Sequence, residues 1–176
     1  MAKKQYLIIV PKNKWILVAI TGTPGAGKTL LARKLSLFTH GVYLDLNKIA
    51  IKGGLKAGID LPRKSVIINE RGLFGVLKPY LKPGSIYYVD SHLSHCLPKS
   101  KVRLCIVAKA SLGTLKKRLI NRKYPYSKIK ENLEVEAFGV CQTEAQENGH
   151  RVFEVDTTKG ISKKSLSNIV SQIKLK

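Results

Sequence analysis

The sequence predicts an α/β fold with helices on both faces of a parallel sheet. Short apolar segments of strand length alternate with longer segments of helical periodicity, which is the pattern of this fold class. The segment 15–21 (WILVAIT) is apolar throughout, as expected of a central strand that is buried on both faces. A glycine-rich turn follows it, and apolar residues then recur at helical spacing in 29–38. A chain of 176 residues suggests one domain, 1–176, with a sizeable core.

The remaining elements follow from the same patterns. Further strands are expected at 41–46, 65–69, 85–90, 103–110 and 151–156. Further helices are expected at 111–123, with Ser111 as its N-cap, at 127–148, ended by Gly149, and at 161–173. Because only PKNK separates the apolar segment 6–10 (YLIIV) from the first central strand, this segment is a candidate for an added N-terminal strand, paired as a hairpin.

Basic residues dominate the first three quarters of the chain. The net charge is +21, and residues 1–130 hold 26 of the 32 Lys and Arg residues but only 4 of the 11 Asp and Glu residues. Such a charge attracts polyanions. We therefore expect contact with RNA or a pre-ribosome, and the alternative is a lysine-rich surface that is merely solvated.

Cysteine usage and hydropathy exclude other classes. Cys96, Cys105 and Cys141 form no CxxC pair, which indicates small core thiols in a reducing compartment. The segment HLSHC (92–96) is one cluster, whereas a structural zinc site needs four ligands, so zinc is not expected. No apolar run approaches the roughly 18 residues of a membrane span, and YLIIV is too short for a signal-peptide core. We expect a cytoplasmic protein without membrane contact, or a nuclear one in a eukaryote.

The segment GTPGAGKT (22–29) matches the phosphate-binding loop pattern G-x-x-x-x-G-K-[ST] in full, and it lies between a strand and a helix as that loop requires. Its glycines let successive backbone N–H groups point at phosphate, and the helix adds its positive end. Lys28 brings a charge to the outer phosphates, and Thr29 offers its hydroxyl to Mg²⁺. We expect ATP to be bound by Gly22, Pro24, Gly25, Ala26, Gly27, Lys28 and Thr29.

Asp90 and His92, at the end of a neighbouring strand, are the next candidates for the catalytic site. Asp90 ends the segment YYVD (87–90), where a phosphate-loop protein needs a carboxylate for Mg²⁺, although a turn-capping Asp is the alternative. His92 lies two residues on, where it would either position the attacking group or serve as a structural loop histidine.

Two arginines favour a kinase over a GTPase. A GTPase would carry an N-K-x-D guanine loop, and the chain has none. Arg118 and Arg122 share one helical face at a spacing of four residues, where like charges are mildly unfavourable unless they face a polyanion such as a triphosphate. Arginine suits that task because it forms bidentate contacts to phosphate. An ordinary basic helix face is the alternative.

Three segments together resemble the adenylate kinase isoenzyme 6 family. They are ITGTPGAGKT (20–29), VDSHLSHCLP (89–98) and RLINRKYPYSKIKENLEVE (118–136). The second contains the family's Asp-x-His element as Asp90 and His92. The third matches its Arg-x-Tyr and Lys-Ile-x-x-Asn-Leu-x-x-Glu elements with Arg122, Tyr124, Lys128, Ile129, Asn132, Leu133 and Glu136. The resemblance extends from about Trp15 to the C-terminus.

The resemblance implies a nucleoside-monophosphate-kinase type of the P-loop NTPase fold. Its three layers would hold a five-stranded parallel sheet of order 2-3-1-4-5, a monophosphate-binding arm at about 41–80 and a lid at about 118–132. It implies transfer of the ATP γ-phosphoryl group to AMP, with ATPase activity, and a role in small ribosomal subunit biogenesis and rRNA maturation beside a platform protein of that subunit. Lys28, Asp90, His92, Arg118 and Arg122 would be catalytic, and Arg122 and Thr157 would also contact ATP.

The acceptor arm departs from the family pattern. Family members often carry an arginine in the helix of this arm, where this chain has Ile51. Lys52, Arg63 or Arg71 would then have to hold the phosphate of AMP. Two other functions therefore remain open: a ribosome assembly chaperone that uses ATP as a timer, and a kinase for a different small substrate.

Overall fold

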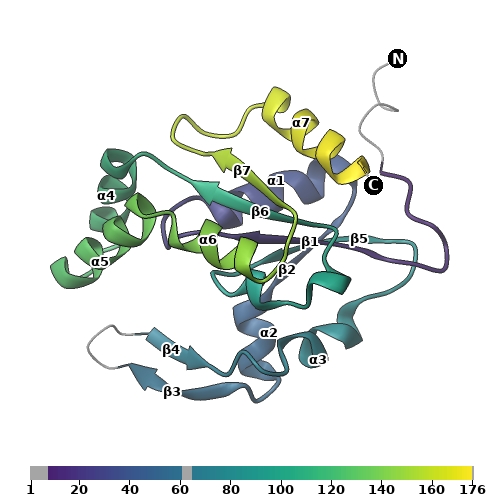
Figure 1. Cartoon of the computed structure of the whole chain (residues 1–176), viewed down its shortest axis with the longest axis horizontal. Helices are drawn as coiled ribbons and strands as arrows, with labels where there is room; N and C mark the ends of the chain where they lie inside the picture. Colours follow the sequence, from purple (N-terminus) through teal and green to yellow (C-terminus); the bar gives the residue numbers. More distant parts are fainter. Residues whose placement is uncertain (1–7, 61–64, 176) are drawn as a thin grey trace.

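The computed structural model describes residues 8–60 and 65–175, and its centre is a five-stranded parallel sheet in the order β2-β5-β1-β6-β7 (Figure 1). The strands are β1 (Ile16–Thr21), β2 (Val42–Asp45), β5 (Ile86–Asp90), β6 (Leu104–Lys109) and β7 (Val152–Asp156). Counted along the chain within this sheet, the order is 2-3-1-4-5, which confirms the predicted fold class and topology.

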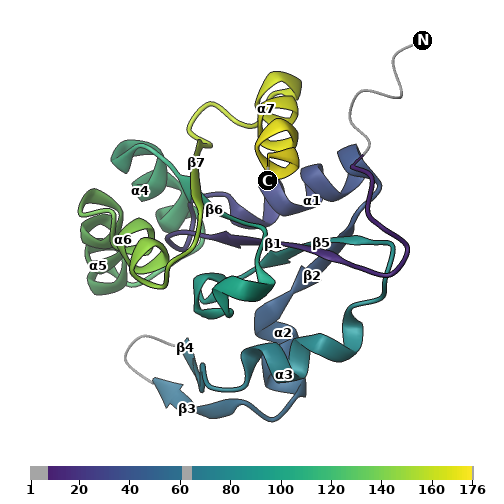
Figure 2. The ribbon, with the colours of Figure 1, turned by 45° about the vertical axis from the view of Figure 1, so that its right-hand side comes forward.

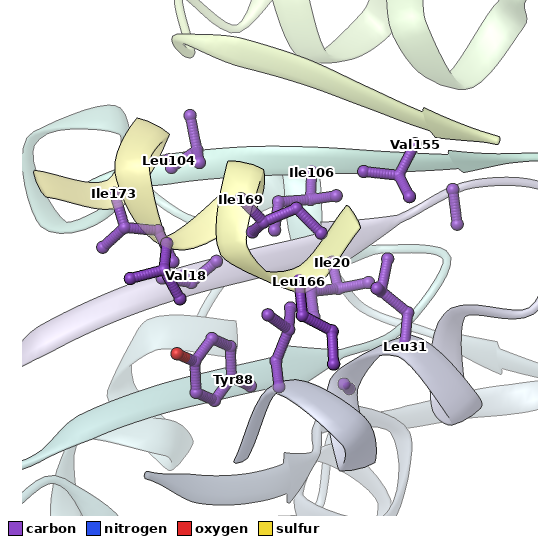
Figure 3. Packing of buried hydrophobic residues seen from close by; sticks show 14 of the residues in the cluster. Val18, Ile20, Leu31, Tyr88, Leu104, Ile106, Val155, Leu166, Ile169 and Ile173 are labelled. Carbon is purple, nitrogen blue, oxygen red and sulfur yellow. The ribbon is translucent and has the colours of Figure 1, made fainter. Parts of the chain in front are cut away.

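Alternating side chains of β1 contribute to the hydrophobic cores on the two opposite faces of the sheet, as the pleat of a strand requires. Val18 and Ile20 point to one face and Leu17 and Ala19 to the other, and all four are at most 1% exposed. The first face is covered by α1 (Lys28–Thr39) and α7 (Lys163–Lys174), whose side chains interdigitate with those of the sheet (Figure 3).

The opposite face is covered in two parts (Figure 2). Helices α2 (Leu46–Lys52) and α3 (Leu73–Leu77) pack on β1 and β5, and α6 (Val140–Glu147) packs on β1 and β6. Short 3-10 turns η1 (Lys78–Tyr80), η2 (Ser94–Cys96) and η3 (Lys99–Lys101) connect the strands on this side. The resulting three layers are those the sequence predicts.

A separate antiparallel hairpin stands beyond the sheet, formed by β3 (Lys56–Asp60) and β4 (Ser65–Ile68). The strand at 65–69 is confirmed, but its partner β3 was not predicted, because KAGID is too polar and too short to be distinguished from a loop. The hairpin, α2 and α3 fall within residues 41–80, the segment expected to be the acceptor arm.

The prediction of one long helix at 127–148 is wrong, because two helices occupy these residues. They are α5 (Tyr126–Ala137) and α6, and Gly139 between them has a left-handed backbone with φ of 65°. Such a φ is easy only for glycine. Preceding them, α4 (Leu112–Asn121) begins at Ser111, whose side chain caps Thr114 N as predicted. Beyond the break, Gly149 ends α6 with φ of 76°.

The predicted N-terminal hairpin is also wrong for the residues described. Residues 8–10 form no strand, and Ile8 instead belongs to the core cluster that also contains residues of α1 and α7. Tyr6 and Leu7 of the same segment lie outside the described residues. In the part of the chain that is described, no helix combines the length and apolar character needed to cross a bilayer.

Candidate active site

The phosphate loop joins β1 to α1 in the conformation that its glycines permit. Gly22, Gly25 and Gly27 have φ of 132°, 91° and 94°. The neighbours are close as well: a Cβ on Gly22 would lie 2.3 Å from the carbonyl oxygen of Ala108, and one on Gly27 would lie 2.9 Å from Thr157 Oγ1. Larger residues are therefore excluded by both the backbone conformation and the available space.

Lys28 curls back into this loop. Its Nζ donates hydrogen bonds to the carbonyl oxygens of Gly22 at 2.7 Å and Thr23 at 3.0 Å. Burial lowers the pKa of Lys28 to about 8, and the nearby Asp90 carboxylate acts in the opposite direction. The ammonium group is thus surrounded by the loop, where its loss of hydration favours a strong interaction with an anion.

Asp90 accepts hydrogen bonds from hydroxyl groups of two other elements at the carboxyl edge of the sheet. Thr29 Oγ1 donates to Asp90 Oδ2 at 2.6 Å, and Tyr43 Oη donates to the same oxygen at 3.3 Å. Asp90 is 6% exposed, and burial raises its pKa, while the Thr29 hydroxyl and the Lys28 charge act against that rise. These hard oxygen donors suit Mg²⁺. Tyr43 has no motif around it, so its contact with Asp90 was not predicted.

His92 lies on the wall of the cleft, and its side chain is open to solvent on one side. Its pKa is lowered from the ordinary value, first because the surrounding protein displaces water and then because Lys28 lies nearby. Both effects favour the neutral imidazole of His92, which can donate one hydrogen bond and accept another.

The two predicted arginines have different surroundings. Arg122 lines the cleft. Arg118 instead holds the back of the phosphate loop: Nη1 donates to the Gly25 carbonyl at 3.2 Å and to Thr157 Oγ1 at 3.0 Å, and Nη2 donates to the Thr157 carbonyl at 2.8 Å. Thr157 in turn donates to the Ala26 carbonyl at 2.6 Å. Arg118 and Thr157 thus brace the loop from the side away from the cleft.

A second brace comes from α5. Glu136 accepts hydrogen bonds from Thr23 Oγ1 at 2.5 Å and from Ala110 N at 2.7 Å, so it links α5 to the phosphate loop and to the turn after β6. Glu136 belongs to the quoted family element, but its partner Thr23 is 113 residues away in the sequence and could not be named from it.

The cleft has a volume of about 940 Å³ and lies between the phosphate loop, the hairpin and the α5–α6 region. We call residues 22–29 with Asp90 and Arg122 its loop side. We call Asp45, Ile51, Val66, Ile68 and Glu70 its hairpin side. Lys52 and Arg71 are not among the described residues that line the cleft, and Arg63 lies outside the described residues.

Comparison with known proteins decides the family. A family model described as "AAA domain" matches residues 18–139. A Pyrococcus furiosus protein named "Putative adenylate kinase" is 35% identical over 90% of this chain and 84% of its own. The Saccharomyces cerevisiae protein named "Adenylate kinase isoenzyme 6 homolog FAP7" is 33% identical over 90% of this chain and 82% of its own. The chain belongs to the adenylate kinase isoenzyme 6 family.

Solved structures support the fold of this family member. Shikimate kinase from Acinetobacter baumannii, in complex with shikimate, superposes with a TM-score of 0.55 at 14% identity and covers 92% of each chain. A Chloroflexus aurantiacus protein described as "a putative kinase" gives a TM-score of 0.56 at 18% identity, covering 94% of this chain and 96% of its own. The protein is a kinase of the adenylate kinase family with a nucleotide-binding phosphate loop.

Proposed function

We propose that this kinase transfers the γ-phosphoryl group of ATP to AMP, giving two ADP, and hydrolyses ATP when water takes the place of AMP. One observation carries the proposal: the Thr29 hydroxyl is bonded to the Asp90 carboxylate beside the enclosed ammonium of Lys28, at the floor of a cleft large enough for two nucleotides. These groups are the ones that phosphoryl transfer requires.

Each residue has a role in this reaction. Backbone N–H groups of 22–27 bind the phosphates, Lys28 neutralises the outer ones, and Thr29 and Asp90 hold Mg²⁺. When bound, Mg²⁺ supplies charge neutralisation to the transferring group. Arg122 contributes further positive charge from the cleft wall, while Arg118 and Thr157 position the loop. His92 orients the attacking group by hydrogen bonding.

The segments around the cleft have matching roles in the proposal. Residues 41–80 are the arm that holds AMP, and residues 118–132 are the lid that covers ATP. Bringing the two together excludes water, which favours attack by AMP over hydrolysis. We place AMP on the hairpin side, with its phosphate beside Ile51, where family members often carry an arginine, and facing the loop side across the cleft.

A second candidate is an ATP-timed assembly chaperone with little kinase activity. The observation that favours it is the hairpin side itself, where Ile51 stands and Asp45 and Glu70 add negative charge. An AMP phosphate would be repelled by these carboxylates except where a cation compensates them, as Lys48 does for Asp45 at 3.7 Å. A kinase for another small substrate is the third candidate, and acceptors other than AMP in the same assay would reveal it.

We also propose that the kinase acts in small ribosomal subunit biogenesis, with a platform ribosomal protein as partner and pre-rRNA as a neighbour. The net charge of +21 supports this setting. A salt titration of binding to a small-subunit rRNA fragment tests the RNA contact. Affinity should fall steeply with added salt, and a salt-independent affinity would contradict contact with phosphates.

Chromatography of the products, with ATP and Mg²⁺ in the presence and absence of AMP, tests the proposed reaction. We expect ADP formation that depends on AMP, with turnover on the order of 1–100 per second. Slow release of ADP and phosphate, unaffected by AMP, would replace this proposal with the ATP-timed chaperone.

A further inference from the structure

A row of three hydrogen-bonded side chains, Glu144, His95 and Thr21, runs from the wall of the cleft to the start of the phosphate loop and has no part in the mechanism above. Glu144 Oε2 is 3.2 Å from His95 Nε2, and His95 Nδ1 is 2.8 Å from Thr21 Oγ1. Thr21 Oγ1 also donates to the main-chain carbonyl of His92 at 3.1 Å. The row therefore runs from α6 through η2 to the end of β1.

These hydrogen-bonded side chains join the two segments on which the reaction depends. Thr21 is the last residue of β1 and directly precedes Gly22 of the phosphate loop. His92 belongs to the segment that follows Asp90. Thr21 is 0% exposed and His95 is 5% exposed, so water does not compete for these hydrogen bonds.

The hydrogen bonds fix where the protons are. A threonine hydroxyl has one hydrogen, and the His92 carbonyl can only accept, so Thr21 gives its hydrogen to His92. His95 Nδ1 must then donate its hydrogen to Thr21 Oγ1. One further proton is shared in the contact between His95 Nε2 and Glu144 Oε2, and it is bound to one of these two atoms. Burial acts in the same direction on both partners, since it lowers the pKa of His95 and raises that of Glu144. Other charged or titratable groups near this pair include Glu70, Glu147, His150, His92, Cys96 and Cys141.

The imidazole of His95 is not needed to hold its own turn. The His95 carbonyl already accepts hydrogen bonds from Asn148 Nδ2 at 3.0 Å and from His150 Nε2 at 2.8 Å, and Ser94 Oγ donates to the Val89 carbonyl at 2.9 Å. These contacts anchor η2 without the His95 side chain. The side-chain contacts of His95 therefore have a different consequence, which is the orientation of the Thr21 hydroxyl.

We propose that His95, oriented by Glu144, is a positioning residue for phosphoryl transfer: it fixes the Thr21 hydroxyl, which holds the His92 carbonyl against the start of the phosphate loop. This inference rests on the proposed function, because it assigns a role in the same reaction. The three side chains act on the rate of the chemical step and leave nucleotide affinity unchanged, since none of them belongs to the phosphate loop or is a proposed Mg²⁺ ligand.

The test compares variants of the full chain by kcat, by KM for ATP and by ATP affinity without Mg²⁺. Thr21→Val, which keeps the shape and removes the hydroxyl, should lower kcat on the order of 10-fold with KM changed less than 2-fold. Thr21→Ser should retain near-normal kcat. His95→Leu should match Thr21→Val, whereas His95→Asn, which keeps a donor near Nδ1, should recover part of the rate.

Two further variants exclude a general packing effect. The double variant His95→Leu with Thr21→Val should lose no more than either single variant, because both break the same row of hydrogen bonds. Asn148→Ala, which removes a bond to the same turn without touching Thr21, should leave kcat near normal. Normal kcat in Thr21→Val, losses that multiply in the double variant, or equal losses in kcat and ATP affinity would overturn the inference.

The same assays separate this inference from the proposed acceptor. If the wild-type protein consumes ATP only by hydrolysis, AMP is not the acceptor, and the hydrolysis rate still responds to Thr21→Val as predicted. If the wild-type protein converts ATP and AMP to ADP and Thr21→Val does so at full rate, the positioning role is wrong and the acceptor stands.

Discussion

The loop side and the hairpin side of the cleft are built in different ways. On the loop side, four separate segments brace the phosphate loop through Asp90, Arg118, Glu136 and Thr157, and each of these contacts is at least partly buried. On the hairpin side, Ile51 is 43% exposed and Val66 is 38% exposed, and β4 pairs only with β3 among the described strands.

This difference has a physical consequence. A two-stranded hairpin has little stability of its own, so the hairpin side can adjust to an acceptor at small cost. The loop side is preorganised, as the proposed binding of a triphosphate requires. Under the proposed function, the ATP site would be fixed and the acceptor site would form partly on binding, and each side of the cleft offers a test.

The largest effect is expected from the centre of the loop side. Lys28→Ala should reduce ATP turnover by at least about 100-fold, because its ammonium is the charge enclosed by the loop. Steady-state assays with and without AMP measure this loss. Lys116→Ala, an exposed lysine on α4, is the control and should remain near normal. Full activity in Lys28→Ala would show that the site has been assigned wrongly.

The next effect concerns the Mg²⁺ carboxylate. Asp90→Asn should lower Mg²⁺-dependent turnover roughly 10- to 100-fold, while Mg²⁺-free ATP binding changes much less, because the amide keeps the shape but not the charge. A Mg²⁺ titration of activity, with binding measured in parallel, separates the two. Asp156→Asn is the matched control. It removes the charge of another strand-end carboxylate, which accepts a hydrogen bond from Thr158 N and has no contact with Thr29. Equal losses in turnover and Mg²⁺-free binding would assign Asp90 a structural role.

A gain of function is expected on the hairpin side. Ile51→Arg places a guanidinium at the cleft wall, where it should offset Asp45 and Glu70 and lower the KM for AMP on the order of 10-fold. Ile59→Arg adds the same charge on β3 at a residue that does not line the cleft, so it should leave this KM unchanged. An unchanged KM in Ile51→Arg would mean that the phosphate of AMP is held elsewhere.

The smallest effect is expected from the brace between α5 and the loop. Glu136→Gln weakens the bonds to Thr23 and Ala110, and it should lower the free energy of unfolding by about 1 kcal/mol. Urea denaturation measures this change. Glu134→Gln on the same helix removes an exposed pairing with Lys130 at 3.9 Å and should cost less. If the Glu134 variant proved the less stable of the two, the brace would not contribute as described.

The same contrast explains what the sequence could predict. The phosphate loop is a local motif, so its place between a strand and a helix could be predicted from residues 15–38, and Asp90 follows from the end of an apolar strand. Continuous apolar runs such as 15–21 predict strands buried on both faces, and these features need only neighbouring residues. The order of the strands was implied by the family resemblance, and the structure confirms it.

Other features depend on residues far apart in the chain. The Tyr43 contact with Asp90 and the Glu136 contact with Thr23 form only after the sheet is assembled. The break at Gly139 was missed because apolar spacing continues across it, and β3 was missed because its sequence is polar. The roles of Lys52, Arg63 and Arg71 remain predictions, since sequence spacing alone does not place a side chain in a cleft.

The reverse reaction tests the central claim most directly. The purified protein is incubated with ADP and Mg²⁺ alone, and ATP and AMP are quantified by chromatography. Transfer between two nucleotides is reversible, so the account predicts that ATP and AMP form at equal initial rates, before hydrolysis removes ATP, and at least about 100-fold more slowly with Lys28→Ala. Persistence of ADP in a preparation that hydrolyses added ATP would contradict it, because an ATPase cannot form ATP from ADP alone.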